Sequence, residues 1–144
     1  MQLNRTTLIA ASLLMFVLLA STVVVADAQE SQSRLANSNG NGTLKVGREE
    51  FKVTAVVVKL MDDHQAEITL VSDITVFLTG TWSASDNNAQ AINLEITGGA
   101  SGGGVEATGK LLLSENGKEV VTLDIKGANR ISKRSIVLSF QGTK

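Results

Sequence analysis

One short run of this sequence brings together side chains of the types that bind metal ions. It contains the only histidine, His64, together with Asp62, Asp63 and Glu67. An imidazole beside carboxylates can bind a divalent cation, but the ligand spacings of structural and catalytic metal sites do not occur here. We therefore interpret the run as a solvated turn and predict that the protein has no metal site.

A glycine-rich run, residues 98–104 (GGASGGG), imitates two catalytic motifs. Residues 99–103 match the G-x-S-x-G of a nucleophile elbow, which requires a histidine later in the chain, whereas His64 lies earlier. Residues 104–110 match the first seven positions of a phosphate-binding loop, but Leu111 stands where Ser or Thr should bind Mg²⁺. The sequence also has no cysteine to act as a thiol nucleophile. We predict that the protein is not an enzyme, has no catalytic residues and uses no cofactor.

The aromatic and charged residues argue against nucleic acid and carbohydrate as ligands. Beyond the first 28 residues the chain has three phenylalanines, one tryptophan and no tyrosine, too few rings for a stacking platform. Without Arg5 and Asp27, the 13 basic and 14 acidic residues become 12 and 13, so the net charge stays at −1. That balance attracts neither nucleic acid nor an anionic membrane surface. We predict no nucleic-acid partner.

The N-terminus has the pattern of a cleaved signal peptide. A start with one positive charge precedes the apolar run from Leu8 to Val25, and Ala26-Asp27-Ala28 provides a small-x-small cleavage site. Residues 1–28 are therefore predicted to direct export, which makes the protein secreted or periplasmic and leaves it without a membrane attachment. The alternative is an uncleaved anchor, because about 18 apolar residues can just span a bilayer.

The rest of the chain divides at Gly42. Residues 29–42 (QESQSRLANSNGNG) are polar and low in complexity, which predicts a flexible spacer. In residues 43–144, apolar and polar residues alternate in short segments between turn residues, which is typical of antiparallel strands with one buried face. The predicted inward residues are Ala66, Ile68, Leu70, Ile74, Val76, Leu78, Trp82, Ile92, Leu94, Ile96, Val105, Ala107, Leu111, Leu113, Val121, Leu123, Ile125, Ile136, Leu138 and Phe140.

Two further patterns bear on the architecture. Residues 51–60 (FKVTAVVVKL) have apolar groups on both faces, which is compatible with a central strand, a bulged strand or a strand covered by the N-terminal segment. Residues 79–98 and 108–127 align without a gap and predict a repeated hairpin, the second with a two-residue type I′ turn at Asn116-Gly117. We predict a single all-β domain over residues 43–144, an antiparallel meander of about seven or eight strands that forms a small barrel or a sandwich.

Residues 80–82 (Gly-Thr-Trp) resemble the G-x-W motif of lipocalin-like barrels, which are exported meanders of similar strand number. In those proteins the motif lies near the start of the barrel, whereas here at least three predicted strands precede it. The resemblance covers three residues and does not assign the chain to that family. If the sheet closes, we expect Trp82 to plug one end of the barrel rather than to contact a ligand.

These observations favour an exported, non-catalytic binding module for a protein partner or a small apolar ligand. The alternative is a structural or self-assembling component of the cell envelope or extracellular matrix, in which strand edges pair between molecules. The inward residues either pack into a solid core, which we prefer, or line a narrow cavity. The predicted cavity or core wall consists of Ile68, Leu70, Val76, Leu78, Leu94, Leu111 and Leu123.

Overall fold

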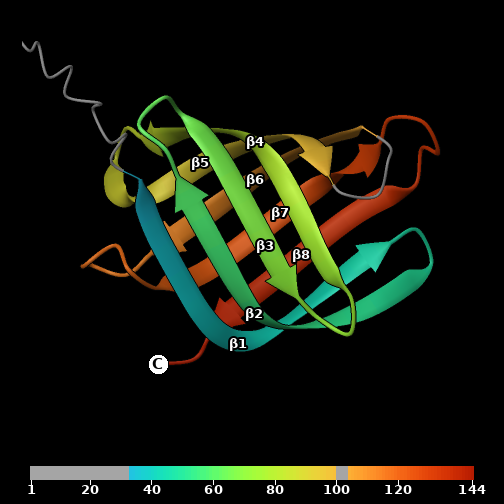
Figure 1. Ribbon diagram of the computed structural model, residues 1–144, viewed down its shortest axis with the longest axis horizontal. Helices are drawn as coiled ribbons and strands as arrows, with labels where there is room; N and C mark the ends of the chain where they lie inside the picture. Colours follow the sequence, from blue (N-terminus) through green and yellow to red (C-terminus); the bar gives the residue numbers. More distant parts are fainter. Residues whose placement is uncertain (1–32, 100–103) are drawn as a thin grey trace, which may run out of the picture. The chain divides into compact units, whose positions relative to one another are not determined.

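The computed structural model describes residues 33–99 and 104–144, which form a closed barrel of eight antiparallel strands (Figure 1). Each strand pairs with the next in the chain, and β8 pairs with β1. The predicted all-β antiparallel meander is confirmed, and the architecture is the barrel rather than the sandwich. The strands are β1 (Arg34–Val46), β2 (Glu49–Leu60), β3 (Gln65–Val71), β4 (Thr75–Ser85), β5 (Asn88–Gly99), β6 (Val105–Leu113), β7 (Val120–Asn129) and β8 (Ser135–Gly142).

The predicted signal peptide, residues 1–28, lies outside the described residues and stays a prediction. In the described part of the chain, no helix has the length and apolar character needed to cross a membrane.

The barrel interior is filled by apolar side chains from all eight strands. None of the described polar or charged residues is buried, and Phe140, Leu70 and Leu123 are among the large side chains with almost no exposed surface. Most residues predicted to face inward are buried. The exceptions are Ile74, which is exposed in a turn, and three half-buried residues, Val76, Trp82 and Val121.

Val121 departs from its predicted place because β7 carries a bulge. The register between β6 and β7 shifts after Leu112, so that Leu113 pairs with Val120 and Leu112 pairs with Thr122. The bulge leaves Val121 without a partner on β6 and turns Val120 into the core, where it is 1% exposed. The prediction for Val121 is therefore wrong, and its neighbour takes its place.

The prediction of a flexible spacer is wrong over residues 34–42, which form most of β1. This strand pairs with β2 on one side and, over residues 40–46, with β8 on the other, so it closes the barrel. The inward positions of its polar run hold small residues, Ser38, Gly40 and Gly42, while asparagines occupy the alternate positions. Composition suggested a linker, but the period-two alternation belongs to a strand.

Small residues are required in β1 because β8 crosses it closely. A Cβ atom at Gly40 would lie 2.6 Å from Cζ of Phe140 and would also collide with the carbonyl oxygen of Gln141. A Cβ at Gly42 would lie 2.9 Å from Cδ2 of the same Phe140 ring. The aromatic ring thus fills the space that the two glycines leave, a pairing that stabilises glycine positions in sheets.

The apolar residues on both faces of β2 are explained by a change of register. Asn39 pairs with Ala55 but Gly42 pairs with Val53, so the β1–β2 ladder is interrupted at this point. On one side of the interruption Val56 and Val58 face the core, and on the other side Val53 does. The extra residue lies in β1, where Gly40 and Asn41 stand opposite Thr54, so the bulge belongs to the strand paired with β2 and not to β2 itself. A consequence is that Phe51 and Glu49 point toward the inside of the barrel beyond the bulge.

The hairpin between β6 and β7 does not have the predicted type I′ turn. Type I′ needs positive φ at both central residues, but only Gly117 has it (φ +68°), and Asn116 does not. The connection spans residues 114–119 instead, closed by hydrogen bonds from the Gly117 amide to the Ser114 carbonyl (2.8 Å) and from the Ser114 amide to the Glu119 carbonyl (3.0 Å).

Antiparallel succession places the connections alternately at the two ends of the barrel. Residues 61–64, 86–87 and 114–119 lie at one end, which we call the Trp82 end. Residues 47–48, 72–74 and 130–134 lie at the other, which we call the mouth end.

Candidate functional site

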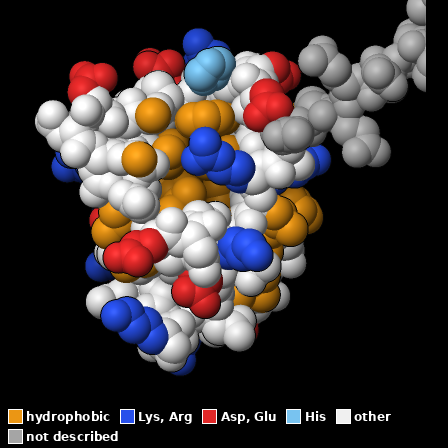
Figure 2. Space-filling model, turned by 90° about the vertical axis from the view of Figure 1, so that its left-hand side faces the viewer, with side chains coloured by type: hydrophobic (Ala, Val, Ile, Leu, Met, Phe, Trp, Pro, Cys, Tyr) orange, Lys and Arg blue, Asp and Glu red, His pale blue; other side chains and the backbone are white. Residues whose placement is uncertain are grey.

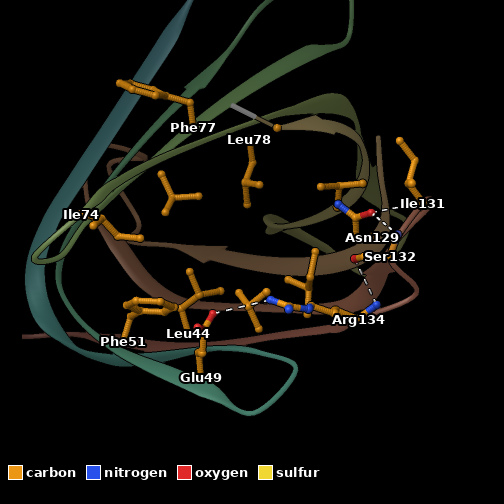
Figure 3. Close-up of a pocket in the computed structure, with 15 residues that line it drawn as sticks. Leu44, Glu49, Phe51, Ile74, Phe77, Leu78, Asn129, Ile131, Ser132 and Arg134 are labelled. Atoms are coloured by element: carbon orange, nitrogen blue, oxygen red, sulfur yellow. Dashed lines mark hydrogen bonds and ion pairs between the residues drawn. The ribbon is translucent and has the colours of Figure 1, made fainter. Parts of the chain in front are cut away.

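The mouth end contains a pocket of about 560 Å³, drawn in Figure 3. Seven strands contribute to it, because strands of an antiparallel barrel end together at each rim. Its lining is mostly apolar: Leu44, Val46, Phe51, Ile74, Val76, Phe77, Leu78, Gly99, Val105, Ile131 and Ile136, with the polar residues Glu49, Asn129, Ser132 and Arg134. We refer to this space as the mouth pocket.

The floor and walls of the mouth pocket are continuous with the core. Leu44, Leu78 and Val105 are buried members of the core cluster, and Figure 3 shows the Leu78 side chain directed into the pocket. Phe51 and Val76 are half-buried and pack against the same cluster. In a sealed barrel a further layer of side chains would cover this apolar surface. At the mouth end the described residues do not form that layer, so the apolar surface stays accessible to solvent.

Two isoleucines lie at the rim on opposite sides of the pocket (Figure 3). Ile74 belongs to the turn between β3 and β4 and is 48% exposed, and Ile131 belongs to the turn between β7 and β8 and is 76% exposed. Phe77 is also exposed, but its ring points away from the pocket, as its outward parity on β4 predicts (Figure 3). Exposed isoleucines at turn tips are unusual, since turns favour polar residues and glycine.

The turn between β7 and β8 supplies the polar corner of the pocket. The Oδ1 atom of Asn129 accepts hydrogen bonds from the amides of Ile131 (2.9 Å) and Ser132 (2.8 Å), which fixes the turn. Lys133 then adopts a left-handed backbone conformation (φ +58°). Arg134 extends toward β2, where its Nη1 lies 3.8 Å from Oε2 of Glu49 (Figure 3). Both charged side chains are largely exposed, so the pair contributes little to stability and either group is available to a ligand.

The Trp82 end has a different construction. The indole Nε1 of Trp82 donates a hydrogen bond to the carbonyl of Met61 (2.9 Å), and the ring packs against the core. The imidazole of His64 lies 5.1 Å from the indole, and the Arg34 guanidinium carbon is 5.9 Å from the ring centroid. Trp82 therefore packs over the core at this end, the position expected for it in a closed barrel.

Figure 2 views the Trp82 end from outside. Apolar side chains in the centre of this face lie beneath a basic side chain, with the histidine and several acidic side chains around them. The apolar surface here is thus partly covered by the protein's own polar groups.

The residues considered for metal binding belong to this covered end. His64 has positive φ (+65°), and its Nδ1 lies 3.1 Å from the carbonyl oxygen of Trp82. Oδ1 of Asp63 accepts a hydrogen bond from the amide of Gln65 (3.1 Å), which shapes the turn. Among the described residues, no group of three or more His, Cys, Asp or Glu side chains is placed to hold a metal ion.

The residues predicted to form a cavity or core wall are divided between the core and the mouth pocket. Val76 and Leu78 line the pocket. The other five are buried in the barrel and do not line it: Ile68, Leu70, Leu94, Leu111 and Leu123. Most of that wall therefore belongs to the packed interior.

Sequence reasoning did not find the rim residues. Ile131 was available as an apolar residue inside the polar run Ala128–Ser135, but a single apolar residue in a turn carries no pattern. Ile74 was placed with the inward residues of β4 because it continues their alternation, although the strand begins only at Thr75. Glu49 and Phe51 reach the pocket because the inward positions of β2 change at the interruption of the β1–β2 ladder, which alternation alone does not locate.

No known protein-family model matches the chain, and no curated protein or solved structure is significantly similar to it.

Proposed function

We propose that this protein is a non-catalytic binding module that takes up a small, mainly apolar ligand in the mouth pocket. The observation that carries the proposal is an open, mostly apolar pocket of about 560 Å³ at one end of an otherwise solid barrel. Pockets for small molecules typically have volumes of about 300–1,000 Å³ and combine apolar walls with a few polar groups. Arg134, Asn129 and Ser132 are the polar groups available here.

The ligand would lie at the mouth and not deep between the strands. Leu70, Leu123 and Val56 in the barrel interior have no exposed surface, so the core is packed where a deep cavity would have to lie. Removing apolar ligand surface and the exposed pocket walls from water supplies the driving force, at roughly 25 cal/mol per Å².

The alternative drawn from the sequence, self-assembly through strand edges, has less support. A closed barrel presents few unpaired edges, because β1 pairs with β2 and β8 and all other strands pair on both sides. The same argument weakens a protein partner that adds a strand to the sheet.

The proposal is tested with 8-anilinonaphthalene-1-sulfonate, a fluorescent probe with an apolar body. We expect saturable binding at one site, and we expect Val76→Trp to abolish it, because the larger ring would fill the pocket. Val137→Trp is the matched control: the same substitution at an exposed position on the outer face of β8 should leave binding unchanged.

Equal loss of binding in the two tryptophan variants, or no saturable binding by the wild-type protein, would overturn the assignment of the pocket. Native mass spectrometry of the protein from its own host adds a second readout. We expect a monomer with a discrete additional mass that dissociates on activation.

A further inference from the structure

We propose that the mouth end also docks onto an anionic lipid surface, with Ile74 and Ile131 inserted into the interfacial layer and nearby basic residues against the lipid headgroups. The proposal goes beyond uptake of a small ligand, and two of the basic residues on which it rests, Arg48 and Lys133, lie outside the pocket lining.

The first observation is the exposure of apolar side chains at the tips of two separate turns. Ile131 is 76% exposed and Ile74 is 48% exposed, and they lie on opposite sides of the pocket (Figure 3). An exposed isoleucine costs free energy in water, and a membrane interface offers it an apolar environment. Because both tips lie at the same end of the barrel, both can meet one surface at the same time.

The second observation is the charge of the connections at the two ends. At the mouth end the turn residues include four basic side chains and one acidic side chain: Arg48, Arg130, Lys133 and Arg134 against Asp73. At the Trp82 end they include five acidic side chains and one basic side chain: Asp62, Asp63, Asp86, Glu115 and Glu119 against Lys118. The net charge of −1 gave no reason to expect attraction to a membrane. It conceals the opposite charges of the turns at the two ends.

Part of the basic charge is already compensated within the barrel. Arg130 lies 3.8 Å from Glu106, and Arg134 lies 3.8 Å from Glu49. In the described part of the chain, the ion pairs do not include Arg48 or Lys133. These two side chains, on different turns beside the apolar tips, are therefore the best placed to contact anionic headgroups.

A lipid surface fits this arrangement better than an acidic protein does. A stable protein interface needs a continuous complementary area of about 800 Å² on each partner. Here the apolar contacts are single side chains at separate tips with a pocket between them, and a fluid interface accommodates such tips without matching their shape. The mouth pocket would then open toward the lipid.

The test is co-sedimentation with vesicles of phosphatidylcholine alone or mixed with phosphatidylglycerol. The unit Ser31–Lys144 is used, because it contains the complete ring of paired strands and lacks the apolar run 8–25, which has a membrane affinity of its own. We expect binding to vesicles that contain phosphatidylglycerol, weakened by salt. Arg48→Gln with Lys133→Asn should lower the partition coefficient about fivefold per charge, and Ile74→Ser with Ile131→Ser about tenfold per side chain.

The Trp82 end provides matched controls. Leu35 is 56% exposed there, and Leu35→Ser and Lys118→Asn should leave vesicle binding unchanged. Denaturation midpoints verify that each variant is folded. Equal sedimentation with both vesicle types, none with either, or equal losses from the control variants would overturn the proposal, as would capture of an acidic protein through the tips without vesicle binding.

The two proposals fail separately. Val76→Trp should lose the fluorescent probe and keep vesicle binding, whereas Arg48→Gln with Lys133→Asn, at residues that do not line the pocket, should keep the probe and weaken vesicle binding. Vesicle binding without probe binding in the wild-type protein would overturn the small-ligand proposal alone.

Discussion

The two ends of this barrel differ in how the core side chains are covered. Each end of a filled barrel leaves core side chains without a further layer above them. At the Trp82 end an aromatic ring packs over the core and is fixed by a hydrogen bond to the Met61 carbonyl and by neighbouring His64 and Arg34. At the mouth end Phe51 and Val76 line an open pocket, and Ile74 and Ile131 extend into solvent.

The difference separates stability from binding. A ring that donates a hydrogen bond and packs on the core makes folding more favourable and leaves little for a ligand to contact. Exposed isoleucines contribute little to folding and gain free energy only when something covers them. Mutations at the Trp82 end are therefore expected to lower the stability of the protein, and mutations at the mouth end are expected to weaken binding.

The largest effect is expected in the shared core, on which the contrast between the ends depends. Leu123 is completely buried between its strand neighbours Leu111 and Phe140. Leu123→Ala should lower the free energy of unfolding by about 2–5 kcal/mol, measured by chemical denaturation. A loss well below this range would mean that the interior contains a void. The barrel would then not combine a solid core with one open end.

Substitution of one aromatic residue at each end tests the contrast directly. Trp82→Ala removes a hydrogen-bonded ring from the core surface and should cost about 3 kcal/mol. Phe51→Ala removes a half-buried ring from an open pocket and should cost about 1.5 kcal/mol, since less surface returns to water. Equal losses in urea titrations would show that the two ends contribute alike to stability.

The seam between β1 and β8 keeps both ends in one closed ring. Gly40→Ala would press a methyl group against Phe140 and the backbone of β8 and should cost about 1–3 kcal/mol. Asn41→Ala, at the neighbouring exposed position, should stay within about 0.5 kcal/mol. If both variants unfold at the same denaturant concentration, residues 40–42 do not make the close contact that the structure shows.

The smallest effect on stability is expected at the turn tips of the mouth end. Ile131→Ser should change the free energy of unfolding by less than about 0.5 kcal/mol, because the side chain is mostly in water. A loss above 1 kcal/mol in thermal or urea unfolding would be unexpected. Such a result would mean that Ile131 packs within the molecule and does not serve as a contact for an external surface.

The sequence determined the elements of this protein but not all of their boundaries. Alternation from Gln65 onward identified the strands, because a sheet with one buried face requires a period of two. Composition misled at residues 34–42, where asparagine and glycine suggested a linker. The close approach of β8, with Phe140 over Gly40 and Gly42, is what turns that run into a strand, and it is invisible before the chain folds.

The candidate site depended still more on tertiary structure. The chain by itself fixed an apolar interior without cysteine and a net charge near zero. Closure of the ring, the bulge that turns Phe51 inward and the grouping of Ile74 with Ile131 were decided only by folding, because strands distant in the chain end at the same rim. Alternation is a local property that each segment carries. A pocket and the charge of a rim depend on residues from several segments, which come together only in the folded barrel.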